Sequence, residues 1–119
     1  MEPYISGEFF AGSPKIPGVE AFAIISADGL PIASYYPPNV DESRIAAMTA
    51  TLLNLSKKAM VEMNKGIFDE TYIKGSEGYL LVMQAGQNAI LIVSIKKDAR
   101  LGLILLDCRR ICEKIAKLI

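Results

Sequence analysis

The amino-acid sequence predicts an α+β fold in which one five-stranded antiparallel sheet carries a long helix and a C-terminal helix, in the order β-β-α-β-β-β-α. Five short apolar runs are bounded by turn-forming residues, as is typical of antiparallel strands. Two longer segments, 41–64 and 98–118, carry apolar residues at steps of three and four, which indicates amphipathic helices. The chain of 119 residues has the size of one domain, which we expect to span residues 18–119.

An irregular arm is expected before this domain, at residues 1–17, because three prolines and two glycines in that stretch disfavour a helix. The first hairpin follows, with strands at 19–26 and 30–36 on either side of an Asp-Gly turn. Pro31 has no N–H to donate to a neighbouring strand. The second strand should therefore lie at an edge of the sheet.

The long helix is expected to begin at Asp41, a favourable N-cap residue, and to run to about Asn64, with Gly66 as the stop signal. Its apolar side chains fall on two stripes. The first stripe consists of Ile45, Met48, Leu52, Leu55, Ala59 and Met63. The second consists of Ala46, Ala47, Ala50, Leu53, Met60 and Val61. One stripe suffices for a helix that lies on a sheet, so two stripes indicate that the helix is also covered from a second side.

Three more strands are predicted at 70–74, 79–84 and 89–95. The first is short and alternates polar and apolar residues, as a strand at a free edge would, whereas the other two are nearly all apolar and should be central. The final helix is expected to start with Asp98 as its cap. Lys114 and Lys117 near its end complement the helix macrodipole.

The composition excludes several classes of function. Thirteen Lys and Arg residues balance thirteen Asp and Glu residues, which argues against a nucleic-acid partner. The chain has no His, the usual general base at neutral pH and the usual zinc or iron ligand. Cys108 and Cys112 offer only two ligands, so we expect reduced core thiols and no metal. The turns at 75–78 and 85–88 do not match the phosphate-binding pattern G-x-x-x-x-G-K-[ST], and we expect no cofactor and no enzymatic activity.

The longest uncharged run, 78–95, is nearly long enough to span a membrane. Its middle, 84–88, is polar, which favours a hairpin of two buried strands instead. The start of the chain lacks the basic and apolar regions of a secretory signal. We therefore expect a cytoplasmic protein without membrane insertion. A mean hydropathy of +0.30 nevertheless indicates some apolar surface that another chain covers.

Several stretches resemble Roadblock/dynein light chain domains. The sequence PGVEAFAIISADGLPIAS at 17–34 is similar to the opening hairpin of that family, and KKDARLGLILLDCRRICEKIAKLI at 96–119 is similar to its last helix. Between them, IAAM at 45–48 and YIKGSEGYLLVM at 72–83 fall in the family order. The chain looks most like the stand-alone prokaryotic members, often archaeal. It departs from the family at its start, where GEFFAGSPKI replaces the usual first helix.

The resemblance implies a non-enzymatic homodimer that binds a small Ras-like GTPase and regulates or scaffolds it. In such a dimer the third strand of each protomer pairs with its twin, and the two long helices pack beside one another. A structural scaffold, a motor-associated light chain or a longin-like adaptor with no effect on GTP turnover is the alternative. Pairing with a paralogue, and activation as against inhibition of the GTPase, stay open.

Two sets of residues follow from this arrangement. The small residues of the second stripe let two helices approach closely, and the third strand supplies the paired edge. The predicted dimer interface consists of Ala46, Ala47, Ala50, Leu53, Met60, Thr71, Tyr72 and Ile73. The polar side of the long helix is predicted to face the GTPase through Arg44, Lys57, Lys58 and Glu62.

Overall fold

The computed structural model describes residues 16–119, so most of the predicted arm at 1–17 lies outside the described residues. The predicted element order is confirmed. The strands are β1 (Val19–Ser26), β2 (Pro31–Tyr35), β3 (Glu70–Gly75), β4 (Gly78–Ala85) and β5 (Ala89–Lys96). The helices are α2 (Glu42–Glu62) and α3 (Leu101–Leu118).

The five strands form one antiparallel sheet in the order β2-β1-β5-β4-β3. The prediction that β2 and β3 are edge strands is therefore confirmed. Pro31 pairs with Ile25 where the register of β1 and β2 shifts, and a proline is tolerated at such an edge position. The two strands predicted to be central, β4 and β5, lie inside the sheet.

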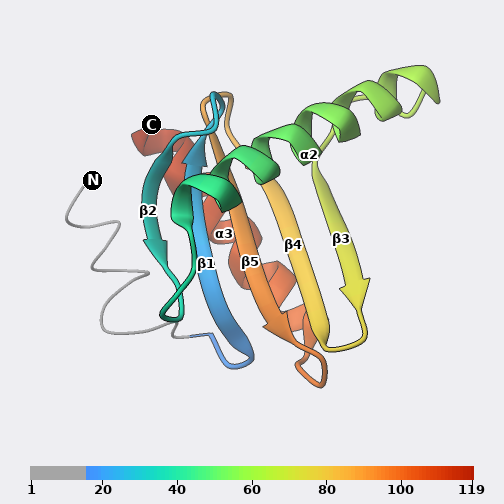
Figure 1. Cartoon of the computed structure of the whole chain (residues 1–119). Helices are drawn as coiled ribbons and strands as arrows, with labels where there is room; N and C mark the ends of the chain where they lie inside the picture. Colours follow the sequence, from blue (N-terminus) through green and yellow to red (C-terminus); the bar gives the residue numbers. More distant parts are fainter. Residues whose placement is uncertain (1–15) are drawn as a thin grey trace.

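The two helices cover opposite faces of the sheet (Figure 1). Successive residues of a strand point to opposite faces, which divides the core in two. Phe22, Ile24 and Leu91 pack with α3, whereas Ile25, Val82 and Ile90 pack with α2. We call these faces the α3 side and the α2 side of the sheet.

The ends of the helices agree with the sequence only in part. Asp41 caps α2 as predicted, since its carboxylate accepts the N–H of Arg44 at 3.1 Å. The helix ends at Glu62 with Met63 as its C-cap, close to the predicted end near Asn64, and the first residue with a positive φ after it is Asn64 at 57°, before the expected stop Gly66. The prediction that Asp98 caps the last helix is wrong. Ala99 donates its N–H to the Lys96 carbonyl in a turn, so that α3 begins only at Leu101, without a side-chain cap.

The length of α2 relative to the width of the sheet determines where the candidate site lies. A helix of 21 residues is about 31 Å long, whereas five strands span about 19 Å between the first and the last. Figure 1 shows that α2 crosses the sheet obliquely and that its C-terminal part extends past β3. The helix therefore ends without a sheet strand of its own chain beneath it.

Candidate functional site

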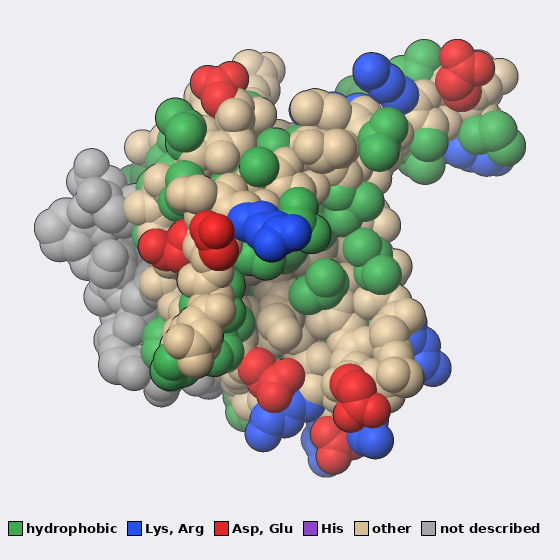
Figure 2. All heavy atoms as spheres, viewed as in Figure 1, with side chains coloured by type: hydrophobic (Ala, Val, Ile, Leu, Met, Phe, Trp, Pro, Cys, Tyr) green, Lys and Arg blue, Asp and Glu red, His purple; other side chains and the backbone are tan. Residues whose placement is uncertain are grey.

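Exposed apolar side chains lie along α2 and on the neighbouring sheet. Met48, Leu55 and Met63 of α2 are 58%, 61% and 67% exposed. On β3 and β4, Ile73 and Leu80 lie directly opposite each other and are 40% and 39% exposed. Figure 2 shows hydrophobic side chains below α2 and on the sheet face beside it. We call this set, Met48, Leu55, Met63, Ile73 and Leu80, the α2–β3 surface.

The helical repeat explains why α2 has a second apolar side. Each residue turns the helix by about 100°, so Ala46, Thr49 and Leu53 share the side that is buried on the sheet. Met48 and Leu55 lie roughly two-fifths of a turn away, on a flank that the sheet does not cover. This exposed flank carries residues of the first apolar stripe of the sequence, and its covering by another chain stays a prediction.

The assignment of the two stripes needs a correction. Ala46 and Leu53 were expected at a seam with a second helix, but they are 0% and 1% exposed because they pack on the sheet of their own chain. Met60 is half-buried against the same core. Ala50 lies beside the β1–β2 turn, since a Cβ added to Gly29 would lie 3.4 Å from the Cβ of Ala50. The flank open to a second helix is instead the first stripe, with Met48 and Leu55.

The other residues of the predicted dimer interface are wholly or partly exposed to solvent. Ala47 is exposed on α2, Thr71 is half-buried, and Tyr72 and Ile73 are 45% and 40% exposed on the edge strand. Their role in an interface stays a prediction.

The backbone of β3 has one free side. Gln84 donates its N–H to the carbonyl of Asp69 at 3.1 Å, which places Asp69 in a hydrogen-bonded pair with β4. In an antiparallel ladder the hydrogen-bonding direction alternates from residue to residue. Thr71 and Ile73 therefore bond to β4, whereas Glu70, Tyr72 and Lys74 direct their N–H and C=O groups away from the sheet. These three residues form an unpaired edge.

A charged cluster holds this edge to α3. Arg109 of α3 donates to the Glu70 carboxylate through Nη2 at 2.5 Å and through Nε at 3.2 Å, and the Tyr72 hydroxyl donates to the same carboxylate. The bond with Arg109 lowers the pKa of Glu70 below its usual value of 4.5. Burial first, and the neighbouring carboxylate second, raise the pKa of Tyr72. Glu70 is thus an ionised carboxylate with a fixed orientation at neutral pH.

Comparison with known proteins identifies the family of this chain. The family model described as Roadblock/LC7 domain matches residues 8–94 of the sequence. The chain belongs to the Roadblock/LC7 family. The match begins inside the segment predicted as an arm, and the boundary of the domain at residue 18 stays a prediction.

This Roadblock/LC7 domain is also similar to individual relatives and solved structures. The chain is 33% identical to the uncharacterized protein MJ1340 of Methanocaldococcus jannaschii over 101 residues, which are 85% of this chain and 88% of that protein. Its fold is similar to that of Myxococcus xanthus MglB, with a TM-score of 0.80 and 19% identity over 84% of this chain and 82% of that one. A Roadblock/LC7 domain from Streptomyces avermitilis also gives a TM-score of 0.80, with 17% identity over 87% of this chain and 88% of that one.

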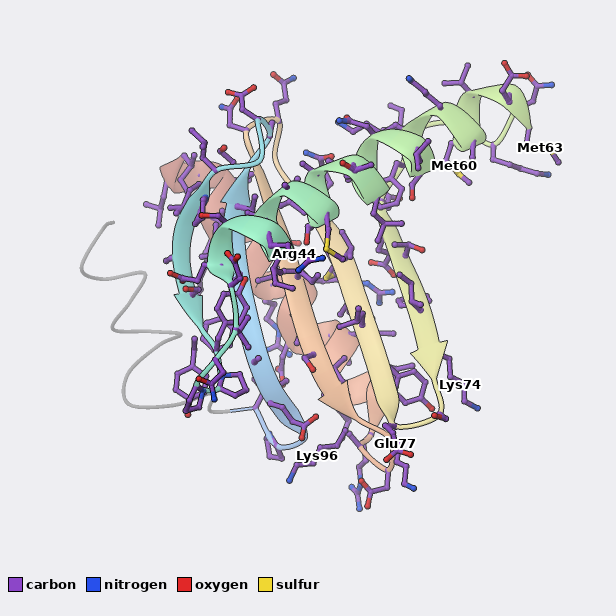
Figure 3. All side chains as sticks on the ribbon, viewed as in Figure 1. Arg44, Met60, Met63, Lys74, Glu77 and Lys96 are labelled. Atoms are coloured by element: carbon purple, nitrogen blue, oxygen red, sulfur yellow. The ribbon has the colours of Figure 1, made fainter. Side chains whose placement is uncertain are left out.

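The residues predicted to face a GTPase are all exposed on this Roadblock/LC7 domain, but they do not form one patch. Arg44 lies in the first turn of α2 (Figure 3), about 20 Å along the helix from Lys57 and Lys58. Arg44, Lys58 and Glu62 share the side that points away from the sheet. Lys57 is turned toward a groove beneath the helix end, which Phe68 and Gly86 also line.

The two thiols lie in the α3-side core of the domain, as predicted. Cys108 and Cys112 are 0% and 7% exposed, and burial raises the pKa of each thiol to about 12. Cys112 Sγ lies 4.0 Å from the sulfur of Met83. Within residues 16–119, no three His, Cys, Asp or Glu side chains come together as metal ligands. In the same range, no helix has both the length and the apolar character that crossing a membrane requires.

Proposed function

We propose that this Roadblock/LC7 domain is a non-enzymatic homodimer that binds a small Ras-like GTPase and regulates or scaffolds it. The observation that carries the dimer is the pairing of two features in one chain: a helix end without a sheet beneath it and a stretch of sheet without a helix above it. A two-fold axis through β3, perpendicular to the sheet, brings each feature onto the other in the partner subunit.

The apolar side chains support this geometry. The axis keeps both copies of α2 on the same side of a ten-stranded sheet, because rotation about a perpendicular axis does not exchange the faces. The end of each α2, with Met63, then covers Ile73 and Leu80 of the partner subunit, while the flank with Leu55 faces the partner's copy of α2. Burial of these exposed apolar side chains removes surface that a monomer would leave in water.

The partner follows from the family resemblance and from the surface that such a dimer leaves open. The side of α2 opposite the sheet carries Arg44, Lys58 and Glu62, and the two-fold axis doubles this polar face. A binding surface can regulate a GTPase without supplying a catalytic group, if it contacts one arrangement of the switch loops better than another. No reactive side chain of the Roadblock/LC7 domain is then required.

Two measurements test the proposal in sequence. Light scattering of the wild-type chain should give twice the chain mass of 13.0 kDa. A mass of one chain at all concentrations up to several hundred micromolar would contradict the dimer. Nucleotide release and GTP hydrolysis are then measured with a small GTPase encoded beside the gene.

The paired variant Arg44→Glu with Lys58→Glu should reduce binding of the GTPase and keep the dimer mass. The pair Arg110→Glu with Lys117→Glu, the same charge change on α3, should keep both the binding and the dimer mass. Binding with altered nucleotide turnover indicates regulation, and binding with unaltered turnover indicates scaffolding. Absence of binding to any small GTPase from the same genome would contradict the proposed partner.

A further inference from the structure

The side chains on the free edge of β3 form a charge pattern that matches a second copy of the same strand. Glu70 lies at the beginning of the strand, Lys74 near its end (Figure 3) and Tyr72 midway between them. All three point to the α3 side, since Tyr72 pairs with Leu81, which belongs to the α3-side core. An acidic, a neutral and a basic residue thus occupy successive positions on one face.

We propose that β3 pairs with its twin in one antiparallel register, centred on Tyr72, in which each Glu70 lies opposite Lys74 of the partner subunit. This inference rests on the homodimer proposed above and adds the register together with the residues that select it.

The faces of the sheet limit the possible registers. Residues directly opposite each other in an antiparallel pair point to the same face. A two-fold axis perpendicular to the sheet preserves the faces, so a residue of the α3 side must oppose another residue of the α3 side. Within β3 the axis can then pass through Thr71, Tyr72 or Ile73. In each case the paired residues are the ones with free backbone groups.

The charges distinguish these three registers. An axis at Thr71 places Glu70 opposite Tyr72, and an axis at Ile73 places Lys74 opposite Tyr72. Both leave the two charges without counter-charges across the axis. An axis at Tyr72 creates two Glu70–Lys74 pairs by symmetry. It also lets Glu70, Tyr72 and Lys74 each donate and accept a backbone hydrogen bond across the interface, which satisfies the whole free edge.

The fixed geometry of Glu70 favours the central register further. Arg109 already holds the carboxylate in place through two hydrogen bonds, so less side-chain freedom is lost when a second cation joins it. Among residues 16–119, Lys74 has no ion-pair partner in its own chain. The anion that Lys74 lacks in its own chain is supplied by Glu70 of the partner subunit, which makes the edge self-complementary.

Single cysteines test the register directly. Opposite residues have Cα atoms about 4.5–5.5 Å apart, within the range of a disulfide, and residues offset by two positions lie beyond 7 Å. Under mild oxidation Tyr72→Cys should form a covalent dimer, whereas Thr71→Cys and Ile73→Cys should not when each is alone. A mixture of Thr71→Cys and Ile73→Cys should cross-link, because these residues oppose each other. The wild-type chain, with its buried thiols, is the background control.

Charge reversal tests the selecting residues. Lys74→Glu should weaken the homodimer about tenfold or more, because it creates two like-charge pairs across the axis. Lys96→Glu, the same charge change on β5, should leave the dimer unchanged. Glu70→Lys should also weaken its homodimer, and a mixture of Glu70→Lys with Lys74→Glu should form a heterodimer.

The outcomes separate this inference from the proposed function. Self-cross-linking of Thr71→Cys or Ile73→Cys alone, or a dimer in which none of the cysteines cross-links, would overturn the register and leave the dimer standing. Lys74→Glu dimerising as tightly as Lys96→Glu would overturn the role of the charges. A wild-type chain that is monomeric by light scattering would refute the dimer itself.

Discussion

The two edge strands of the sheet, β2 and β3, differ in how well they can pair with a strand of another chain. β2 has five residues, starts with Pro31 and joins β1 through an irregular register. β3 has six residues and no proline, pairs regularly with β4 and lies beside the helix end that extends past the sheet. Prolines and irregularities are means by which proteins block strand addition. One edge of this domain is therefore blocked, and the other is kept open and equipped with charges and apolar side chains.

The largest effect on dimerisation is expected from a substitution at the β3 side of the sheet. Leu80→Asp places a carboxylate on the sheet where the partner's helix should lie. We expect the dissociation constant of the dimer to rise by about a hundredfold or more, because two unpaired charges would be buried by symmetry. Light scattering across a dilution series measures this change.

Leu103→Asp is the matched control for Leu80→Asp. Leu103 is 55% exposed, more than Leu80, but it lies on α3 at the opposite face. The Leu103→Asp chain should remain dimeric. Equal dimerisation of the two variants would show that the interface lies elsewhere.

A proline scan of β3 should separate the interface from the fold. Ile73 donates to β4, so Ile73→Pro should lower the free energy of unfolding by about 1–3 kcal/mol through an orphaned carbonyl. Tyr72 donates outward, so Tyr72→Pro should keep most of that free energy and weaken the dimer about tenfold.

Tyr72→Thr, which keeps the N–H, controls for the loss of the ring in the Tyr72→Pro chain. Chemical unfolding at low protein concentration and light scattering provide the two measurements. The reverse pattern, with Tyr72→Pro unfolded and Ile73→Pro monomeric but folded, would mean that the bonding direction along β3 is the opposite one.

The smallest effect concerns pH. The pKa of Glu70 is lowered in the folded chain, chiefly by Arg109. The ionised carboxylate therefore contributes stability above its usual value of 4.5, and the contribution is lost as the pH falls through the lower folded value. The difference in unfolding free energy between the wild type and Arg109→Met should be small at pH 7, because the Arg109 side chain is half exposed and solvent screens the ion pair.

This difference should shrink below pH 4. Urea unfolding of both chains from pH 3 to 7 measures it. A difference that does not change with pH would show that Arg109 acts through packing and not through the charge of Glu70.

The sequence predicts the order of elements and both edge strands because period-two and period-3.6 patterns and one proline carry that information. It does not predict which stripe of α2 faces the sheet. Both stripes are apolar, and hydrophobicity alone does not show that the small Ala46 suits a close approach to the strands while Met48 stays outside. It also misses the contact between Glu70 and Arg109. These residues are 39 positions apart, and only the packing of α3 against the edge brings them together.

Amide hydrogen exchange along β3 tests the central claim, that the free edge of β3 is paired in solution, most directly. At a concentration where the chain is dimeric, the amides of Glu70, Tyr72 and Lys74 should exchange as slowly as those of Thr71 and Ile73, and they should become fast in the Leu80→Asp chain. If Tyr72 exchanges as fast as the turn residues Ser76 and Glu77 while Thr71 and Ile73 stay protected, the edge is free in solution and the proposed interface is contradicted.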